Sequence, residues 1–506
     1  MMRRPVVLSL AALSGLQLAP TPPAAAQELP AGATPGEALP VAQHTLDNGM
    51  TFLILPRRQS PTVSLVVHYP VGSVNEHLGN TGIAHVLEHM LFKGSEEIGT
   101  RDRDGESPLM DAADAVRDSL IAKLVGHESD SAEVRRLRGL AVAIESQAHA
   151  LTIPNEFDRI LTAHGARGLN ATTAHEATRY FVELPANRLE LWFVLEADRM
   201  ANPVMRGFST ELDVVREERR LRLETSPGGI LETSLLATAF QVHPYGVPVI
   251  GHSADLESLT RRQALEYFRA YYGARNAVAA IVGDVDPGQV VEWAEQYFGR
   301  VPPGVPAAPV TAREPEQAGE RRITVEFDAE PRIMIGWRGV SGLHDDAPAL
   351  SMLASVLTAG RTTRLYQRLI ARDQSALHVS AYQGPGFAHP RLFVVSAVPR
   401  SPHTPAELES AIYEEIEAIK REPPDAAALL RIRNQINAGE FRRLSSNLEL
   451  AMQIAASQAS FGDWRETFRL SRRISDVTPG DVQRVAVRYL TPRGRTVATM
   501  VRKGSS

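Results

Sequence analysis

The sequence predicts an α+β protein of two homologous domains, each a mainly antiparallel sheet packed with helices, with a helical hairpin inserted in the first. Three observations lead to this prediction. The chain has 506 residues, whereas a single hydrophobic core stops growing at about 250–300 residues. Residues 302–320 are rich in proline and weakly patterned, which is typical of an interdomain linker. The segment that closes the first half is repeated at the end of the second.

The repeat consists of the segments Thr260–Arg275 and Thr478–Arg493. Both segments open on a threonine that suits a helix start, place a tyrosine eleven residues later and reach an arginine without a gap. Each then runs into a predicted strand, at residues 277–282 and 496–501. This position at the end of each half favours a duplicated domain. We therefore assign residues 40–301 and 321–506 to the two domains.

The first domain opens with strands. Within Thr45–Leu55, an Asn-Gly pair precedes apolar residues, which predicts a tight turn that leads into a strand. Thr62–Tyr69 alternates in the same way and predicts the next strand. Helical spacing of apolar residues begins near Thr81.

Residues 101–154 differ from their surroundings. Two stretches with helical spacing and many charges, 108–126 and 132–150, are joined by a short polar segment, and Pro154 ends the second. This pattern predicts the inserted helical hairpin. We expect it to lie over the cleft or at a subunit contact.

The N-terminus predicts an exported protein. Arg3 and Arg4 precede an apolar stretch, residues 6–18, and a small-residue site follows at residues 24–26. This is the pattern of a Sec-type signal peptide, residues 1–26, with cleavage after Ala26. We expect a periplasmic or secreted protein, and no later segment of the sequence is long and apolar enough to predict a transmembrane span.

Composition narrows the chemistry. The formal net charge is -5 and the basic residues are scattered, so nothing indicates a nucleic-acid partner. The chain contains no cysteine, which excludes disulfides, thiol catalysis and cysteine-ligated zinc. Histidine, aspartate and glutamate remain as metal ligands.

A motif on the first predicted helix carries the chemistry. His85 and His89 are four residues apart, so one helical face can present both imidazoles to one ion. Glu88 borders that face and can accept a proton from a metal-activated water. The H-x-x-E-H spacing is a catalytic zinc signature. The apolar neighbours predict a buried helix, where unpartnered imidazoles and a carboxylate would be costly.

A third ligand must come from elsewhere. Glu211 and Glu218 are seven residues apart, two helical turns, and therefore share a face. One can bind the ion while the other orients an imidazole by a hydrogen bond. The lesser candidates are His164, His175, Glu196 and Asp198.

The chain resembles the inverzincin peptidases, which include pitrilysin, insulin-degrading enzyme and the mitochondrial processing peptidase with its bacterial relatives. The likeness extends over roughly residues 40–502. The matching motifs are His85–Gly94, Gly168–Thr173, Glu196–Met200, Val214–Arg220, His243–Tyr245, Gly283–Val285 and Gly360–Tyr366. The resemblance implies one zinc ion per chain, with Glu218 as the third ligand and Glu211 as its supporting acidic residue.

The resemblance also implies how substrate binds. In relatives the strand that carries an Asn-Ala pair lies at a sheet edge, and the peptide adds to it as another strand. Asn170 and Ala171 match this pair. An unpaired edge supplies main-chain hydrogen bonds whatever the peptide sequence.

One family feature is missing. Relatives carry an Arg and a Tyr seven residues apart in the second domain, whereas Ile370 and Leu377 stand at these positions here. Neither can donate a hydrogen bond, and Arg372, two residues away, is expected to point elsewhere. Some relatives work as pairs in which one subunit holds zinc and the other holds the Arg and Tyr. We expect this chain to be the zinc-bearing subunit of such a heterodimer.

Together these observations predict a zinc-dependent metalloendopeptidase that hydrolyses peptides or small unfolded proteins, with Glu88 as general base. The alternative is a non-catalytic scaffold or binding subunit of a peptidase-like complex, because the family includes members that have lost the metal.

Overall fold

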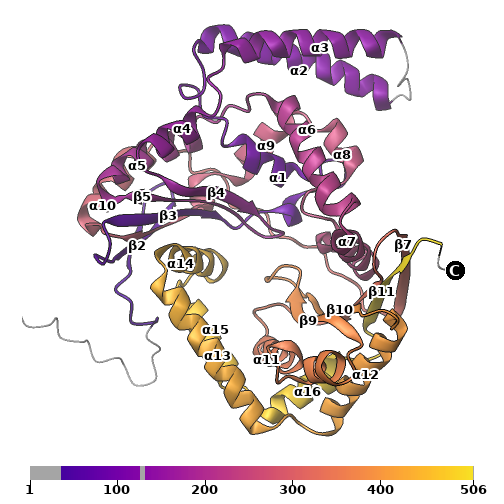
Figure 1. Cartoon of the computed structure of the whole chain (residues 1–506). Helices are drawn as coiled ribbons and strands as arrows, with labels where there is room; N and C mark the ends of the chain where they lie inside the picture. The colour runs from indigo at the N-terminus through magenta and orange to yellow at the C-terminus, as the bar shows by residue number, and fades with distance from the viewer. Residues whose placement is uncertain (1–35, 126–131, 505–506) are drawn as a thin grey trace, which may run out of the picture.

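The computed structural model describes residues 36–125 and 132–504. The predicted signal peptide, residues 1–26, lies outside the described residues. Two sheets, each covered by helices, form the upper and lower halves of Figure 1. The predicted fold class is confirmed.

The first sheet has six strands in the order β1-β2-β6-β3-β5-β4. β2 and β6 run parallel, and every other pair is antiparallel. Its strands are β1 (Ala42–Thr45), β2 (Thr51–Pro56), β3 (Thr62–Tyr69), β4 (Arg167–Thr173), β5 (Thr178–Pro185) and β6 (Val278–Gly283). The expected turn at Asn48-Gly49 joins β1 to β2, and the expected strand at Thr62–Tyr69 is β3.

The second sheet repeats this order without β1. It runs β7-β11-β8-β10-β9, with one parallel pair, β7 and β11. Its strands are β7 (Arg321–Phe327), β8 (Arg332–Arg338), β9 (Ala376–Gly384), β10 (Leu392–Pro399) and β11 (Arg495–Arg502). In each half, the last strand along the chain lies between two earlier strands: β6 lies between β2 and β3, and β11 lies between β7 and β8.

The helices that precede β6 and β11 are α9 (Arg261–Tyr271) and α16 (Pro479–Tyr489). Both start at a capping box, in which the hydroxyl of Thr260 or Thr478 accepts a hydrogen bond from the third helical N–H. The repeat found in the sequence is therefore a repeated helix-strand unit, as expected for a duplicated domain.

Each sheet packs one face against the helices of its own half. In the first half these are α1 (Ile83–Met90), α4 (Glu156–Ala163), α5 (Leu189–Ala201), α6 (Phe208–Arg219), α8 (Ser253–Ser258), α9 and α10 (Pro287–Trp293). In the second half they are α11 (Ala347–Thr358), α12 (Pro405–Arg421), α13 (Ala426–Ser445), α15 (Glu466–Ser475) and α16. Burial of these apolar surfaces is the main stabilising contribution.

The two halves exchange one helix each. α14 (Asn447–Phe461), from the second half, packs on the other face of the first sheet, where Leu450 and Ile454 belong to one buried cluster with Val66 and Ala280. α7 (Pro227–Ala239), from the first half, packs Leu231 and Leu235 on the second sheet in return. Figure 1 shows both helices between the sheets. The face of the first sheet toward α14 is called the inner face below.

The insertion is a helical hairpin, as predicted, formed by α2 (Arg103–Val125) and α3 (Ala132–Leu151). It projects from the top of the first half (Figure 1). α2 begins before the predicted start at residue 108, because Asp102 caps it by accepting a hydrogen bond from the N–H of Gly105, at 3.0 Å.

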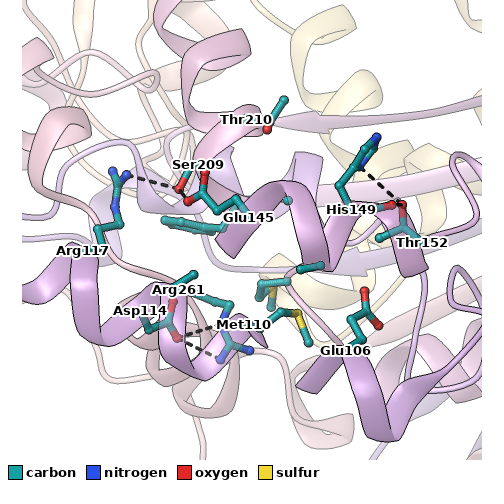
Figure 2. A pocket seen from close by; sticks show the side chains of 15 residues that line it. Glu106, Met110, Asp114, Arg117, Glu145, His149, Thr152, Ser209, Thr210 and Arg261 are labelled. Carbon is teal, nitrogen blue, oxygen red and sulfur yellow. Dashed lines mark hydrogen bonds and ion pairs between the residues drawn. The ribbon is translucent and has the colours of Figure 1, made fainter. Parts of the chain in front are cut away.

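The base of the hairpin is tied to the body by charged contacts. Arg261 of α9 pairs with Asp114, and Arg117 donates to the hydroxyl of Ser209 on α6 (Figure 2). Glu106 and Arg206 form a buried ion pair at 2.9 Å. These polar groups satisfy one another, as an interface within one folded chain requires.

The long segment between α10 and β7 contains no helix or strand over residues 299–320. It is packed against both halves, because Glu314 accepts hydrogen bonds from the backbone of residues 241–243 in the first half and pairs with Arg338 of β8 in the second at 2.9 Å. The domain boundaries placed on either side of it remain a proposal. Across residues 36–125 and 132–504, no helix has the length and apolarity needed to cross a bilayer.

Candidate metal centre

The helix that carries the motif is fixed at its start. The carboxylate of Glu76 accepts hydrogen bonds from the backbone N–H of Gly82 at 2.8 Å and of Ala84 at 2.9 Å. Gly82 has φ of 90°, in the left-handed region that favours glycine. Apolar residues of α1 pack into the first core, and α1 contacts β4, α6 and α9. His85 and His89 therefore occupy defined positions on a buried helix.

α6 brings the acidic residues to α1. It begins after Gly207, whose φ is 61°, and runs to Arg219, so Glu211 lies in its first turn and Glu218 in its last. Both carboxylates face the histidine pair, as a separation of two helical turns allows.

One oxygen of Glu218 lies 3.8 Å from Nε2 of His85, and the other lies 3.4 Å from Nε2 of His89. The three candidate ligand atoms all lie within 4.8 Å of one another. Ligands bound tetrahedrally to one zinc ion at about 2.1 Å would be about 3.4 Å apart. The two nitrogens and one oxygen thus suit a single zinc ion.

Burial makes His85 a suitable ligand. Burial, with smaller effects of His89 and Arg222, lowers the pKa of His85 to about 3, so its imidazole is neutral near pH 7. A metal ligand needs this neutral form, with a free lone pair. The Nδ1 atom of His85 is buried without a hydrogen-bond partner in the described part of the chain, and Nε2 is the atom that faces Glu218.

Glu211 orients the second histidine. Its carboxylate lies 2.8 Å from Nδ1 of His89 and 2.5 Å from Nζ of Lys93. Burial alone would raise the pKa of Glu211, but the contacts with His89 and Lys93 outweigh it and hold the pKa below its usual value. An ionised carboxylate at Nδ1 directs Nε2 toward Glu218, which is the arrangement that metal-bound histidines use. The spacing left open which carboxylate would face both imidazoles, and the structure brings Glu218 to that position.

Glu88 lies beside the ligands rather than among them. It is 9% exposed, and one of its oxygens accepts a hydrogen bond from the hydroxyl of Thr173 at 2.5 Å. Burial raises the pKa of Glu88, whereas Thr173 and His89 oppose the rise. A carboxylate with a raised pKa that borders a metal position is suited to accept and return a proton.

Asn170 and Ala171 lie on β4, the terminal strand of the first sheet. Asn170 is exposed, and its side chain accepts a hydrogen bond from the N–H of Ala171. On its outer side β4 pairs with no strand of the described chain, and its last residue, Thr173, contacts Glu88. The two residues therefore lie on an edge strand that ends at the candidate metal centre.

The lesser candidates have other partners. His164 contacts the carbonyl of Ile160, Glu196 forms a buried ion pair with Arg199, and Asp198 accepts a hydrogen bond from Asn202. His175 packs against Tyr245 at the contact between the two halves. None of the four belongs to the group of ligand atoms found in the described chain.

In the second half, Ile370 packs against the second core, and Leu377 is 57% exposed on β9. Arg372 is largely exposed and pairs with its neighbour Asp373 at 3.1 Å. Neither Ile370 nor Leu377 provides a hydrogen-bond donor from its side chain.

Three contacts of the centre were not anticipated. Thr173 binds Glu88, Lys93 binds Glu211, and Arg222 lies 2.7 Å from Glu218. Thr173 had a signal in the sequence, because alternation along β4 places it on the same face as Ala171, two residues earlier. The two cations depend on helix packing, which spacing does not reveal.

Comparisons with known proteins match this chain to peptidases. The model for insulinase, peptidase family M16, matches residues 53–103, and that for the peptidase M16 inactive domain matches residues 258–436. The chain is 26% identical to the zinc protease PqqE of Helicobacter pylori, over 88% of this chain and 89% of the relative. It is 24% identical to a probable mitochondrial-processing peptidase subunit beta of Arabidopsis thaliana, over 88% and 75%.

The fold is also shared with a solved structure. A protease from Helicobacter pylori superposes with a TM-score of 0.76 at 24% identity, covering 91% of this chain and 99% of the other. With the duplicated fold, the two matched family regions and the H-x-x-E-H motif on α1, these likenesses support one family, the inverzincin peptidases of family M16.

Proposed function

We propose that the chain is a zinc-dependent endopeptidase that hydrolyses peptides or small unfolded proteins. The observation that carries this proposal is the convergence of His85, His89 and Glu218 within 4.8 Å, with the buried carboxylate of Glu88 beside them. Relatives named zinc proteases support the same activity.

The residues present fit one zinc ion per chain. His85 and His89 would hold it through Nε2, and Glu218 would hold it through a carboxylate oxygen. Zinc in such a three-ligand site polarises a carbonyl and lowers the pKa of a bound water to about 7. The negative surroundings that raise the pKa of His89, mainly Glu211 and Glu218 acting against burial, also favour a divalent cation there.

The chain's own residues then handle the proton. Glu88 accepts it from the attacking water and returns it to the leaving amine. Thr173 holds one oxygen of Glu88 at 2.5 Å, which leaves the other oxygen available for this transfer. Burial keeps the pKa of Glu88 above its usual value, and a base closer to neutral pH returns its proton more readily.

Substrate would bind as an added strand on β4. The edge offers backbone N–H and C=O groups along Asn170 and Ala171, in line with the reacting centre. This mode is insensitive to most side chains and suits a broad peptidase.

The test of the proposal compares the wild type with Glu88→Gln. The variant should bind zinc at the wild-type stoichiometry and lose at least about 1,000-fold in kcat/KM, since it removes the general base. Glu97→Gln, an exposed neighbour, should change neither quantity. Full turnover by Glu88→Gln, or turnover that a chelator leaves unchanged, would contradict the proposed mechanism. A wild-type chain that binds peptides without turnover would instead be a scaffold or binding subunit.

We further propose a heterodimer with a homologous subunit that supplies the Arg and Tyr absent at Ile370 and Leu377. The relative named as a peptidase subunit supports such pairing. Copurification from the native host, with activity measured before and after removal of the partner, tests this. Peptide cleavage by the purified chain at a rate that no partner improves would contradict it.

Export is proposed as well. The apolar N-terminal pattern supports a signal peptide cleaved after Ala26, and a periplasmic or secreted protein. Mass spectrometry of the protein from its host should find Gln27 as the first residue, and an intact N-terminus would contradict this.

A further inference from the structure

An arginine on the inner face of the first sheet lacks a counter-ion among the residues that the structure describes. Arg179 lies on β5, where alternate residues point to opposite faces. Tyr180 and Val182 pack into the core beneath α1, whereas Phe181 packs toward α14. Arg179 shares the face of Phe181 and therefore points to the inner side.

Arg179 is partly buried, and no carboxylate of the described chain lies within 4.0 Å of its guanidinium. The acidic residue four positions along its strand, Glu183, is already occupied by a 2.8 Å hydrogen bond from the hydroxyl of Ser64. Its register partner on β3 is His68, which is 2% exposed. Burial and then the charge of Arg179 lower the pKa of His68 to about 3, so His68 is neutral. A desolvated cation without a counter-ion is unfavourable, and an anion from outside the chain would relieve that cost.

A cavity gives such an anion access. It has a volume of about 640 Å³. Its wall is formed by Arg179 from the first half and by residues of α13 and α14 from the second. Those residues are Gly439, Arg442, Arg443, Glu449, Met452, Gln453 and Ala456.

The charges on this wall favour an anion. Arg443 is paired with Glu440 at 2.5 Å, but Arg442 is exposed and has no ion-pair partner among the described residues. Glu449 is the carboxylate of the wall, and it is exposed to solvent. Three arginines therefore face one cavity with a single carboxylate on its wall.

The cavity is aligned with the reacting centre along the strands. Thr173, which contacts Glu88, pairs with Thr178, and Thr172 pairs with Arg179. Arg179 is therefore one residue, about 3.3 Å, from the level of Glu88 along the strand direction, on the opposite face of the sheet. A peptide added to β4 would direct every second side chain toward the inner face.

The distance suits two long side chains. A strand added to β4 would lie two strand spacings from β5, about 9.6 Å. An arginine and a glutamate side chain can span this distance together, each leaning across β4. A shorter or uncharged side chain on the peptide would leave Arg179 unpaired.

We propose that Arg179, with Arg442 beside it on the cavity wall, forms a subsite for an acidic substrate side chain next to the scissile bond. The subsite rests on the proposed peptidase function and adds to it a preference for glutamate over glutamine. Arg179 contacts the bound peptide and is a specificity residue rather than part of the zinc centre.

The experiment uses matched peptides that differ by Glu or Gln at one position at a time around a single cleavage site. For the wild type, kcat/KM should be at least about tenfold higher for glutamate at one position, the effect of one charge-assisted hydrogen bond. Arg179→Gln should abolish this ratio, Arg179→Lys should retain part of it, and Arg442→Gln should reduce it. Arg431→Gln is the matched control, since Arg431 is exposed on the same helix as Arg442 but is not among the residues of the cavity wall.

Two further measurements distinguish a failure of the proposed subsite from a failure of the proposed function. Each peptide is made with a free and an amidated C-terminus, so that capture of a terminal carboxylate is distinguished from capture of a side chain. Binding of fluorescent peptides to Glu88→Gln is measured by anisotropy, which needs no turnover. An absence of hydrolysis with a retained glutamate preference in binding would overturn the proposed function alone. Equal binding of Glu and Gln peptides, a preference that follows the C-terminus, or a ratio unchanged in Arg179→Gln would overturn the subsite.

Discussion

The carboxylate of Glu211 lies 2.8 Å from Nδ1 of His89, although 122 residues separate the two along the chain. This contact fixes which ring nitrogen of His89 faces Glu218. It also connects the first turn of α6 to the last turn of α1, so the helix packing and the ligand geometry depend on each other.

Removal of this carboxylate should weaken metal binding without removing a ligand. We expect Glu211→Gln to lower zinc affinity by about 10-fold to 100-fold, the usual effect of losing the partner of a ligand histidine. Competition with a chelator of known affinity measures it. Glu217→Gln, an exposed neighbour that pairs with Arg220, is the control and should bind zinc as the wild type does. Equal affinities in the two variants would contradict an orienting role.

Thr173 should lower the pKa of Glu88, the proposed general base. Its hydrogen bond stabilises the ionised form of Glu88, so Thr173→Val should raise the pKa of Glu88. The acidic limb of the pH profile of kcat/KM should then move to higher pH, while zinc content stays constant. Thr172→Val, which alters the exposed neighbour, should leave the limb in place. A limb that does not move in Thr173→Val would show that another group controls it.

Glu76 should make stability depend on pH. Burial raises its pKa from 4.5 to about 8, although the N–H groups of Ala84 and Gly82 oppose the rise. Because the pKa is higher in the folded state, the stabilising contribution is complete below the unfolded value and is lost as pH rises toward 8. The melting temperature should therefore fall over this window, and Glu76→Gln should flatten the fall. If the melting temperature of Glu76→Gln falls with pH as steeply as that of the wild type, this would contradict the raised pKa of Glu76.

The ion pair at the base of the hairpin should be important for stability. Arg206 and Glu106 are 5% and 2% exposed, and Arg206 also donates to the carbonyl oxygens of Lys93 and Ile98. Glu106→Ala would leave a buried charge without its partner, which costs about 3–5 kcal/mol. Calorimetry should show a clear fall in the melting temperature. Glu133→Ala, from an exposed pair on α3, should cause almost none, and equal shifts in both variants would contradict the argument.

Much of the centre follows from local spacing. His85, Glu88 and His89 lie on one helix, and Glu211 and Glu218 lie on another, so helical periodicity alone places each set on a face. The sequence repeat likewise predicts a second sheet like the first. Thr260–Arg275 is followed by β6 and its repeat by β11, and each of these strands lies between two others in its sheet.

The remainder depends on long-range packing. Spacing could not decide between Glu211 and Glu218, since that choice depends on how far α6 lies from α1. The exchange of α7 and α14 between the halves leaves no local signal either, because an apolar helix face does not identify the sheet that it covers. Arg179 appeared unremarkable in the sequence for the same reason, since its missing counter-ion becomes visible only when α13 and α14 are in place.

The zinc content of the purified chain tests the central claim most directly. The full-length protein is equilibrated with excess zinc, desalted and analysed for metal, alongside Glu218→Ala and the control Glu217→Ala. We expect one zinc ion per chain in the wild type and in Glu217→Ala, and almost none in Glu218→Ala. A wild-type chain without zinc, or a Glu218→Ala chain that retains a full equivalent, would contradict the proposed centre.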